Sequence, residues 1–294
     1  MRRLWHLRGI TLWDLLRRVW DDVMRHDVFG QAAELAYFFL LALFPLLILL
    51  TNIFGYFAQS EELRSSLLDY FARVLPHSAF ILVEKTLNQI TSGASGGKLS
   101  LGILGTLWAA SSGMAALNDG LSRAYEIKDR RPWWKARLVS IGLTFLFAAF
   151  TAFFLFLILA GEQFGAFIAG QAGLGSAFPW FWAIARWPLA FFFALTVVHL
   201  LYRFAPDIQE WHWKWMTPGA LVAVGMWMLV SVGFRLYLRH YNSFNATYGS
   251  LGAVVILMLW FYIAAIAILT GAELDSELEK AAELEDRGRL PLAS

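Results

Sequence analysis

The sequence contains no cysteine among its 294 residues. This absence excludes disulfide bonds, thiolate catalysis, and metal or iron–sulfur sites that need cysteine ligands. Charged residues are also scarce, at 16% of the chain, and the net charge of +2 is too small to argue for nucleic acid binding by itself. The composition therefore does not indicate a disulfide-stapled, cysteine-dependent or nucleic-acid-binding protein.

Signals of catalysis are missing as well. The six histidines are scattered along the chain, and no two have the HxH or HExxH spacing of a metal site. The sequence has no glycine-rich phosphate loop with a lysine and no nucleophile elbow. We therefore predict that the chain is not an enzyme and uses no cofactor and no metal.

Apolar residues are what the sequence has in abundance. Hydrophobic residues make up 59% of the chain, aromatic residues 16%, and the mean hydropathy is +0.55. Only a bilayer can act as solvent for this much apolar surface. The clearest span runs from Tyr248 to Glu273 and has no Lys, Arg, Asp, Glu or His between these two residues. At about 1.5 Å per residue it can cross the roughly 30 Å hydrocarbon core.

Similar runs predict an all-α, polytopic membrane protein with six transmembrane helices. The predicted spans are about 35–57, 99–117, 138–160, 180–202, 217–238 and 248–272. Pro45 lies near the middle of the first span, where it removes a backbone hydrogen bond and favours a kink. The N-terminus lacks the continuous apolar segment of a signal peptide, so we expect the first span to be the uncleaved insertion signal.

Three water-facing segments flank or interrupt this membrane domain of residues 35–272. Residues 1–34 are predicted to be cytoplasmic, and Leu12, Leu16, Val19 and Val23 fall on one face of a helix. That face suits a helix on the membrane surface or one packed on cytoplasmic loops. Residues 58–98 are predicted to form a small helical cap outside the cytoplasm, and residues 273–294 a charged cytoplasmic tail.

The distribution of Lys and Arg sets the predicted orientation. The segment before the first span and the loop after the second carry six each, whereas the loop after the third carries none. Positively charged residues concentrate on the cytoplasmic side of membrane proteins. Both termini are therefore predicted to lie in the cytoplasm.

Polar residues inside or beside the spans are the candidate functional groups. In the second span, Gly105, Ala109 and Gly113 recur every fourth residue and would let another helix approach closely. Ser111 and Ser112 lie on the same helix. Their hydroxyls either line a wet groove or bond back to their own helix backbone.

Charged groups at membrane depth are costly and often functional. The carboxylates of Glu34, Asp119 and Glu273 fall at the predicted cytoplasmic boundary, where an end-of-helix carboxylate near water is the other interpretation. Asn118 and Arg203 lie at the same boundary. Whether the three carboxylates meet in space is left open by the sequence.

Several motifs, in order along the chain, resemble the YihY/BrkB family of bacterial inner-membrane proteins. They are Ala32-Ala33-Glu34-Leu35-Ala36-Tyr37, Leu43-Phe44-Pro45, Tyr202-Arg203-Phe204-Ala205-Pro206, Pro218-Gly219-Ala220, Tyr248-Gly249-Ser250-Leu251-Gly252 and Gly271-Ala272-Glu273. Ala42 departs from the pattern, because a serine is expected before Leu-Phe-Pro. The resemblance implies a six-helix protein of the bacterial inner membrane.

The family has carried the older label ribonuclease BN, and some members are associated with virulence or with envelope lipid export. A metal-dependent nuclease needs clustered His and Asp, which this sequence does not show. We expect a membrane transporter or lipid translocase instead, with membrane lipids as partners, no nucleic acid partner, and self-association left open. The alternative is a non-transporting scaffold for envelope assembly, acting through the cap and the tail.

In the translocase hypothesis each candidate residue has a role. Pro45 would open a cleft, which Ser111, Ser112, Asn118 and Asp119 would line. Glu34, Arg203 and Glu273 would bind a lipid head group or gate the inner mouth of the cleft.

Overall fold

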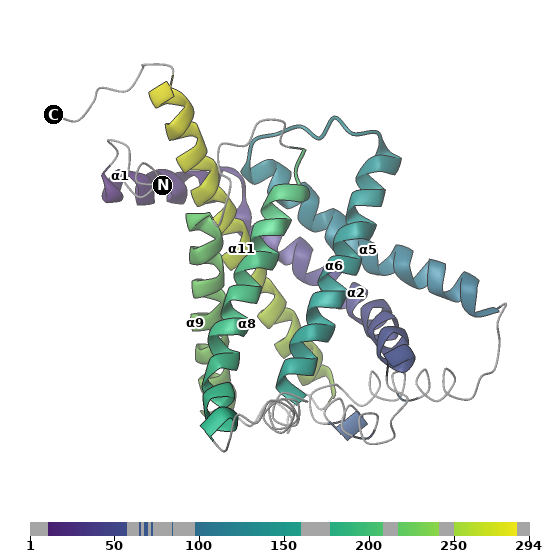
Figure 1. The fold of residues 1–294 in the computed structure, drawn as a ribbon. Helices are drawn as coiled ribbons and strands as arrows, with labels where there is room; N and C mark the ends of the chain where they lie inside the picture. The colour runs from purple at the N-terminus through teal and green to yellow at the C-terminus, as the bar shows by residue number, and fades with distance from the viewer. Residues whose placement is uncertain are drawn as a thin grey trace.

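The computed structural model describes residues 11–57, 98–159, 177–207, 217–240 and 250–286, together with single positions between 65 and 84. The described residues form seven helices (Figure 1). They are α1 (Leu12–Arg25), α2 (Val28–Phe57), α5 (Lys98–Ala124), α6 (Trp133–Leu159), α8 (Ala177–Phe204), α9 (Pro218–His240) and α11 (Ser250–Asp286). The all-α prediction is confirmed for this part of the chain. Nearly all of the predicted cap, residues 58–98, lies outside the described residues.

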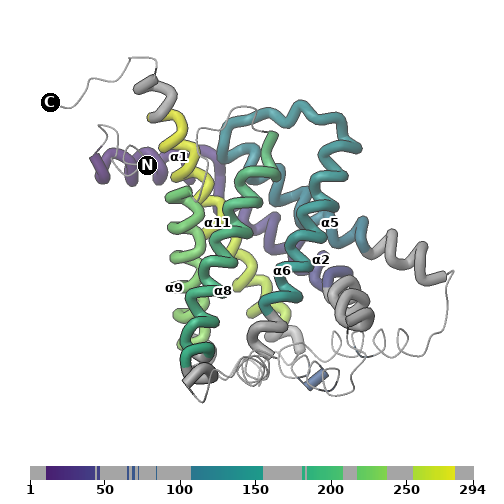
Figure 2. Tube along the Cα trace, viewed as in Figure 1, coloured from purple at the N-terminus to yellow at the C-terminus, as the bar shows by residue number. Residues whose placement is uncertain are grey.

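The six long helices alternate in direction, and α1 lies across one end of them (Figures 1 and 2). The C-terminal end of α11 lies at this same end, which we call the α1 end. Side-chain contacts agree with this arrangement, because His26 at the end of α1 contacts Glu273 in the second half of α11.

Four of the described helices are long and apolar enough to cross a membrane. The stretches are Trp133–Phe154, Ile184–Phe204, Pro218–Leu236 and Val254–Ala281, and between 17% and 28% of their most apolar windows is buried inside the protein. Large side chains such as Trp187 and Leu229 are 66% and 75% exposed. Apolar surface of this extent suits lipid rather than water.

The helices extend beyond the spans predicted from hydropathy. α2 begins at Val28 rather than at residue 35, α5 continues to Ala124, and α11 continues to Asp286. Hydropathy marks where a helix meets hydrocarbon, whereas these extensions are stabilised by packing and caps at the α1 end. As a result, Asn118, Asp119 and Glu273 lie inside helices rather than in the segments that follow them.

The inward face of α1 differs from the predicted one. Val19 and Val23 are buried as expected, but Leu12 and Leu16 are 59% and 52% exposed. Leu15 takes their place in the core. Apolar residues occupy so much of the circumference of α1 that the packing on α2 and α11, rather than the apolar pattern, selects the buried side.

Glycines allow the closest helix crossings. A methyl group at Gly219 of α9 would overlap the carbonyl oxygen of Gly271 of α11, and one at Gly271 would lie 2.5 Å from the Gly219 oxygen. The predicted small-residue face of α5 is confirmed at Gly113, where an added methyl would lie 3.2 Å from Ala42 of α2. Ala109, on the same predicted face, is exposed.

Candidate functional site

The chain turns sharply between α1 and α2, which places His26 at a corner. Thr11 caps α1 by accepting a hydrogen bond from the Asp14 backbone N–H at 3.2 Å. Asp27 adopts a left-handed conformation, with φ of 50°, and its carboxylate accepts from the Gly30 N–H at 3.2 Å, which caps α2. Aspartate is one of the few residues that adopt this conformation readily, so the turn is encoded locally.

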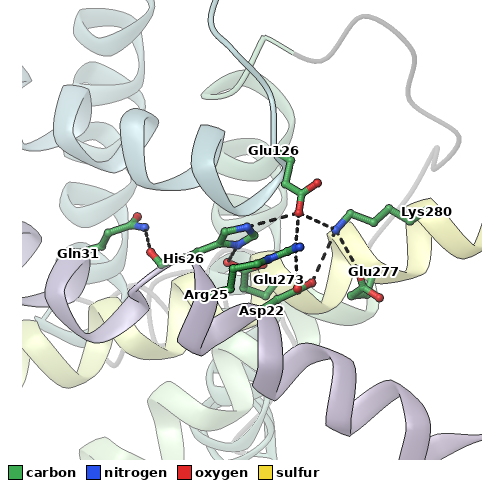
Figure 3. Close-up of polar contacts among 8 residues, drawn as sticks. All are labelled: Asp22, Arg25, His26, Gln31, Glu126, Glu273, Glu277 and Lys280. Atoms are coloured by element: carbon green, nitrogen blue, oxygen red, sulfur yellow. Dashed lines mark hydrogen bonds and ion pairs between the residues drawn. The ribbon is translucent and has the colours of Figure 1, made fainter.

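A charged cluster surrounds this corner (Figure 3). Its members come from α1, from the residues after α5 and from α11, and they are Asp22, Arg25, His26, Glu126, Glu273, Glu277 and Lys280. His26 Nδ1 lies 2.8 Å from Glu273 Oε1, and His26 Nε2 lies 3.4 Å from Glu126 Oε1. Glu273 is fully buried, with 0% exposure, so the interpretation of it as an end-of-helix carboxylate near water is not the one observed. Packing of α1 over α11 removes it from solvent.

The remaining charges complete the cluster. Arg25 pairs with Asp22 at 2.7 Å and also with Glu126. Lys280 lies 2.9 Å from Glu277, 3.2 Å from Glu126 and 3.6 Å from Asp22. Glu126 has φ of 53°, a conformation that costs a non-glycine residue about 1–2 kcal/mol. This backbone conformation brings one carboxylate within reach of three cationic or ionisable partners.

A second polar group fastens the loop between α5 and α6. Arg131 donates to the Asp129 carboxylate at 2.8 Å and to the Ala205 carbonyl at the end of α8 at 2.6 Å. It also lies 3.5 Å from the Asn118 side-chain oxygen. The hydrogen bond from Arg131 lowers the pKa of Asp129 below its ordinary value, although partial burial opposes the shift. Asn118 itself is buried beside the Arg131 side chain.

A third polar group joins α8, α9 and α11. The buried Asp275 carboxylate accepts from the Gly219 N–H at 2.7 Å, in the first turn of α9. Thr217 caps the same helix through the Ala220 N–H at 3.3 Å. The Tyr202 hydroxyl of α8 donates to the Ile268 carbonyl of α11 at 2.5 Å. Carbonyl, hydroxyl and carboxylate groups thus tie the crossing at Gly219 and Gly271.

The two serines of α5 bond to their own helix. Ser111 donates to the Trp108 carbonyl at 2.8 Å and Ser112 to the same oxygen at 3.3 Å. Arg137 of α6 reaches Ser112 at 3.2 Å and stacks over the Trp108 ring, 4.0 Å from its centroid. Of the two interpretations left open by the sequence, bonding back to the helix is the one observed. Ser111 is buried and Ser112 half-buried.

Glu34 and Asp119 are both exposed, on the neighbouring helices α2 and α5. Glu273 does not join them and faces His26 instead. Partial burial raises the pKa of Asp119, Arg123 opposes the shift, and the negative charges of Asp129 and Glu34 add to it. Of the other predicted site residues, Pro45 is half-buried within α2 and Arg203 is exposed in the last turn of α8.

Sequence reasoning missed most of the charged cluster, because its members are far apart in the chain. His26 and Glu273 are separated by 247 positions, and no spacing rule joins them. One signal was present, since Asp22 interrupts the apolar side of α1 between Val19 and Val23. A charged residue on a buried helix face needs a partner. Within the described ranges no three His, Asp or Glu side chains are grouped as a metal ion would require.

Comparison with known proteins agrees with the motifs. The family described as virulence factor BrkB matches residues 19–291. The chain belongs to the BrkB family. It is 34% identical over 271 residues to a ribonuclease-like protein, YfkH, of Bacillus subtilis (strain 168), which covers 92% of this chain and 97% of the relative.

More distant relatives are named as membrane proteins. The chain is 26% identical over 283 residues to a UPF0761 membrane protein of Xanthomonas campestris pv. campestris (strain B100). That match covers 94% of this chain but 63% of the longer relative. A UPF0761 membrane protein of Xanthomonas axonopodis pv. citri (strain 306) matches to the same extent. No solved structure matches this BrkB-family chain.

Proposed function

We propose that this BrkB-family protein spans the bacterial inner membrane six times, with both termini in the cytoplasm, and moves lipids between the two leaflets. The alternating directions of α2, α5, α6, α8, α9 and α11 support the six spans (Figure 1). The α1 end holds the positively charged loop between α5 and α6 together with α1. This end is the cytoplasmic one if the positive-inside rule applies.

The observation that carries the lipid proposal is the surface formed by α2 and α5. Glu34 is exposed at the α1 end, and Tyr37 and Leu41, on the same side of α2, are 53% and 51% exposed. On α5, the exposed Asp119 lies on the same side as Ser112 and the 53% exposed Trp108. Each of the two helices therefore presents one carboxylate at the α1 end and large apolar side chains further along, with Arg137 of α6 lying over Trp108. This arrangement is complementary to an amphiphile whose head group is cationic or carries an amine.

The remaining candidate residues take supporting roles in this proposal. Ser111 and Asn118 are buried and position α5 rather than contact lipid. Pro45 lowers the cost of separating α2 from its neighbours, since it lacks one backbone hydrogen bond. Arg203 provides a positive charge for a lipid phosphate at the end of α8, and Glu273 holds the α1 end closed.

Reconstitution in liposomes tests the proposal. The purified protein should move a labelled aminophospholipid between leaflets faster than empty vesicles do. The double variant Glu34→Gln, Asp119→Asn should reduce the rate by at least about tenfold, because each carboxylate that binds an amine contributes on the order of 1.5 kcal/mol or more. Asp14→Asn, an exposed carboxylate of α1, is the matched control.

Three probes are compared with empty vesicles: the aminophospholipid, a precursor resembling lipid A, and small ions. If the purified protein moved none of them faster than empty vesicles do, the proposal would be contradicted. A wild-type rate in the double variant would contradict the assignment of the site while leaving translocation itself intact. The two results are distinguishable because the first concerns the parent protein and the second only the variant.

One observation favours the scaffold alternative. Ser111, Asn118 and the charged cluster are all engaged by the protein itself, as in a bundle that keeps one conformation. A scaffold predicts that the Glu34 and Asp119 variants keep the cellular phenotype of the parent. It also predicts that deletion of residues 60–92, or of residues 287–294, the part of the predicted tail beyond α11, abolishes that phenotype.

The ribonuclease-like name of the Bacillus subtilis relative suggests a third activity, which we do not adopt. A nuclease would have to cleave RNA in a metal-dependent manner after removal of contaminating enzymes. Such cleavage by the purified protein, absent from a mock preparation, would replace the lipid proposal.

A further inference from the structure

Both ring nitrogens of His26 face carboxylates (Figure 3). Nδ1 lies 2.8 Å from Glu273 Oε1, and Nε2 lies 3.4 Å from Glu126 Oε1. A neutral imidazole has one N–H donor and one acceptor nitrogen, and an ionised carboxylate only accepts. A neutral His26 between two ionised carboxylates would therefore hold a nitrogen lone pair against a carboxylate oxygen. The geometry is satisfied when the three side chains together hold one additional proton.

The charged groups around the three side chains come from α1 and α11. The acids that face the site are Asp22 from α1, Glu126 from the segment after α5, and Glu273 and Glu277 from α11, whereas the bases are Arg25 from α1 and Lys280 from α11. From α2, the neutral Gln31 bonds to the His26 carbonyl. Outside the site, the acids Asp22 and Glu277 balance the bases Arg25 and Lys280, so the negative charge next to the imidazole is that of Glu126 and Glu273 themselves.

The burial of Glu273 also favours an additional proton at this site. Glu273 is 0% exposed, and among the described residues its Oε2 atom has no hydrogen-bond partner. An ionised carboxylate in such a position is costly unless a positive charge lies beside it. A proton on His26, or on Glu273 itself, removes that cost. The Glu126 side chain is 42% exposed and gives the proton a route to water.

We propose that His26, Glu273 and Glu126 form a binding site for one proton, and that this proton fastens α1 to α11. The proton comes from water at the α1 end and returns to it, and no covalent bond between heavy atoms changes. The inference does not depend on lipid translocation, because it concerns only the docking of α1.

Loss of the shared proton should weaken the docking of α1 on α11. As the pH rises, the shared proton leaves and His26 repels one of the two carboxylates, so α1 docks more weakly. Docking should therefore be tighter below the pH at which the shared proton is lost than above it.

The absence of cysteine makes this docking measurable. Val19 is 8% exposed and faces the core from α1, whereas Arg18, next to it, is exposed. We would place a single cysteine at each position in turn, as Val19→Cys and Arg18→Cys, in the full-length protein in lipid nanodiscs. We divide the labelling rate of the Val19→Cys variant with a water-soluble maleimide by that of the Arg18→Cys variant. This ratio reports the undocking of α1, because the pH dependence of thiol reactivity is common to both rates and largely cancels. The ratio should rise at least about tenfold as the pH is raised through neutrality, which is the effect of losing one hydrogen bond to a charged group.

The variant Glu273→Gln separates a proton site from simple packing. A glutamine amide can donate to Nδ1 while a neutral His26 donates from Nε2 to Glu126, so all groups are satisfied without the additional proton. The labelling ratio should then stay low and lose its pH dependence. Asp21→Asn, an exposed carboxylate of α1, removes the same charge and should keep the dependence of the parent.

A second variant guards against misfolding of the first. Glu126→Gln follows the same logic at a partly exposed position, with His26 donating to Glu273 and accepting from the new amide. It should also flatten the pH profile. A labelling ratio that does not change with pH in the parent, or a rise that persists in both glutamine variants, would overturn the proton site.

Discussion

The α1 end and the middle of the long helices are held together in different ways. At the α1 end, Tyr202, Ala272 and Glu273 have 0% exposure, and polar groups bond across helices. In the middle, Leu229 and Trp187 are 75% and 66% exposed. Lipid is as apolar as these side chains, so the hydrophobic effect does not press the helices together there. Close backbone contact and hydrogen bonds at the α1 end replace it.

This difference has a consequence for lipid movement. Helices that are fastened at one end by bonds between helices, and held elsewhere by apolar contacts such as those of Phe39 with Phe261 and Trp227 with Trp260, can shift in the middle without breaking a hydrogen bond between helices. If the difference holds, substitutions that disturb the α1 end should cost more stability than substitutions in the middle of the helices.

The largest effect is expected at the crossing of α9 and α11. Gly219→Ala places a methyl group on the Gly271 carbonyl oxygen and 2.5 Å from Asp275 Cγ. Backbone must shift, so we expect a loss of about 3 kcal/mol in the free energy of unfolding, at the upper end of the range for overpacking. Reversible unfolding in mixed detergent micelles measures it.

Two glycines on the same helix serve as controls. Gly225→Ala and Gly233→Ala meet no heavy atom within 4 Å. Alanine favours a helix by up to about 1 kcal/mol over glycine, so these variants should be neutral or slightly more stable. Equal losses at Gly219 and Gly233 would remove the distinction between the two regions.

The next effect is expected from Asp275, whose carboxylate accepts the Gly219 N–H at 2.7 Å. Asp275→Ala leaves that N–H buried without its partner, which costs about 1–3 kcal/mol. Asp275→Asn retains a side-chain oxygen and should lose less. A thermal unfolding series of both variants checks the order. A more stable alanine variant would show that burying the carboxylate costs more than its hydrogen bonds contribute.

A smaller effect is expected from Tyr202→Phe, which removes the hydrogen bond to the Ile268 carbonyl and leaves the ring in place. One such bond contributes about 1 kcal/mol. Thr196→Val, on the same helix, removes only a bond to the Phe192 carbonyl of its own helix and should cost less. The two free energies of unfolding, measured under the same conditions, decide whether bonds between helices stabilise more than bonds within one.

The apolar runs predicted the helices because a bilayer imposes one requirement, about 20 apolar residues with satisfied backbone bonds. The contact at Gly113 followed from small residues at a fixed spacing. The pairing of His26 with Glu273 could not be predicted in this way, since hydropathy reports the solvent of each residue and not its partner. The motifs at Gly219 and Gly271 marked a family, and only the structure shows that they contact each other.

The left-handed conformation of Glu126 could not be predicted from the sequence either. Glutamate has no preference for it, and the conformation exists because Arg25, His26 and Lys280 converge on its carboxylate. Local sequence encodes the turn at Asp27, by contrast, because aspartate both tolerates the backbone geometry and caps the helix that follows. The two conformations differ in that Glu126 depends on contacts with distant segments, whereas Asp27 does not.

The smallest effect is expected where a polar contact at the α1 end is reached by water. The pKa of Asp129 is held below its ordinary value mainly by the hydrogen bond from Arg131. A lowered pKa stabilises the folded state above the ordinary aspartate pKa, and this contribution is lost as the pH falls through the lowered value. Asp129→Asn should therefore destabilise the protein near neutral pH by less than about 1 kcal/mol and have no effect at strongly acidic pH. Hydrogen exchange of the segment between α5 and α6 measures the difference at each pH. A loss comparable to that of Gly219→Ala would mean that charge contacts, rather than buried backbone crossings, fasten the α1 end.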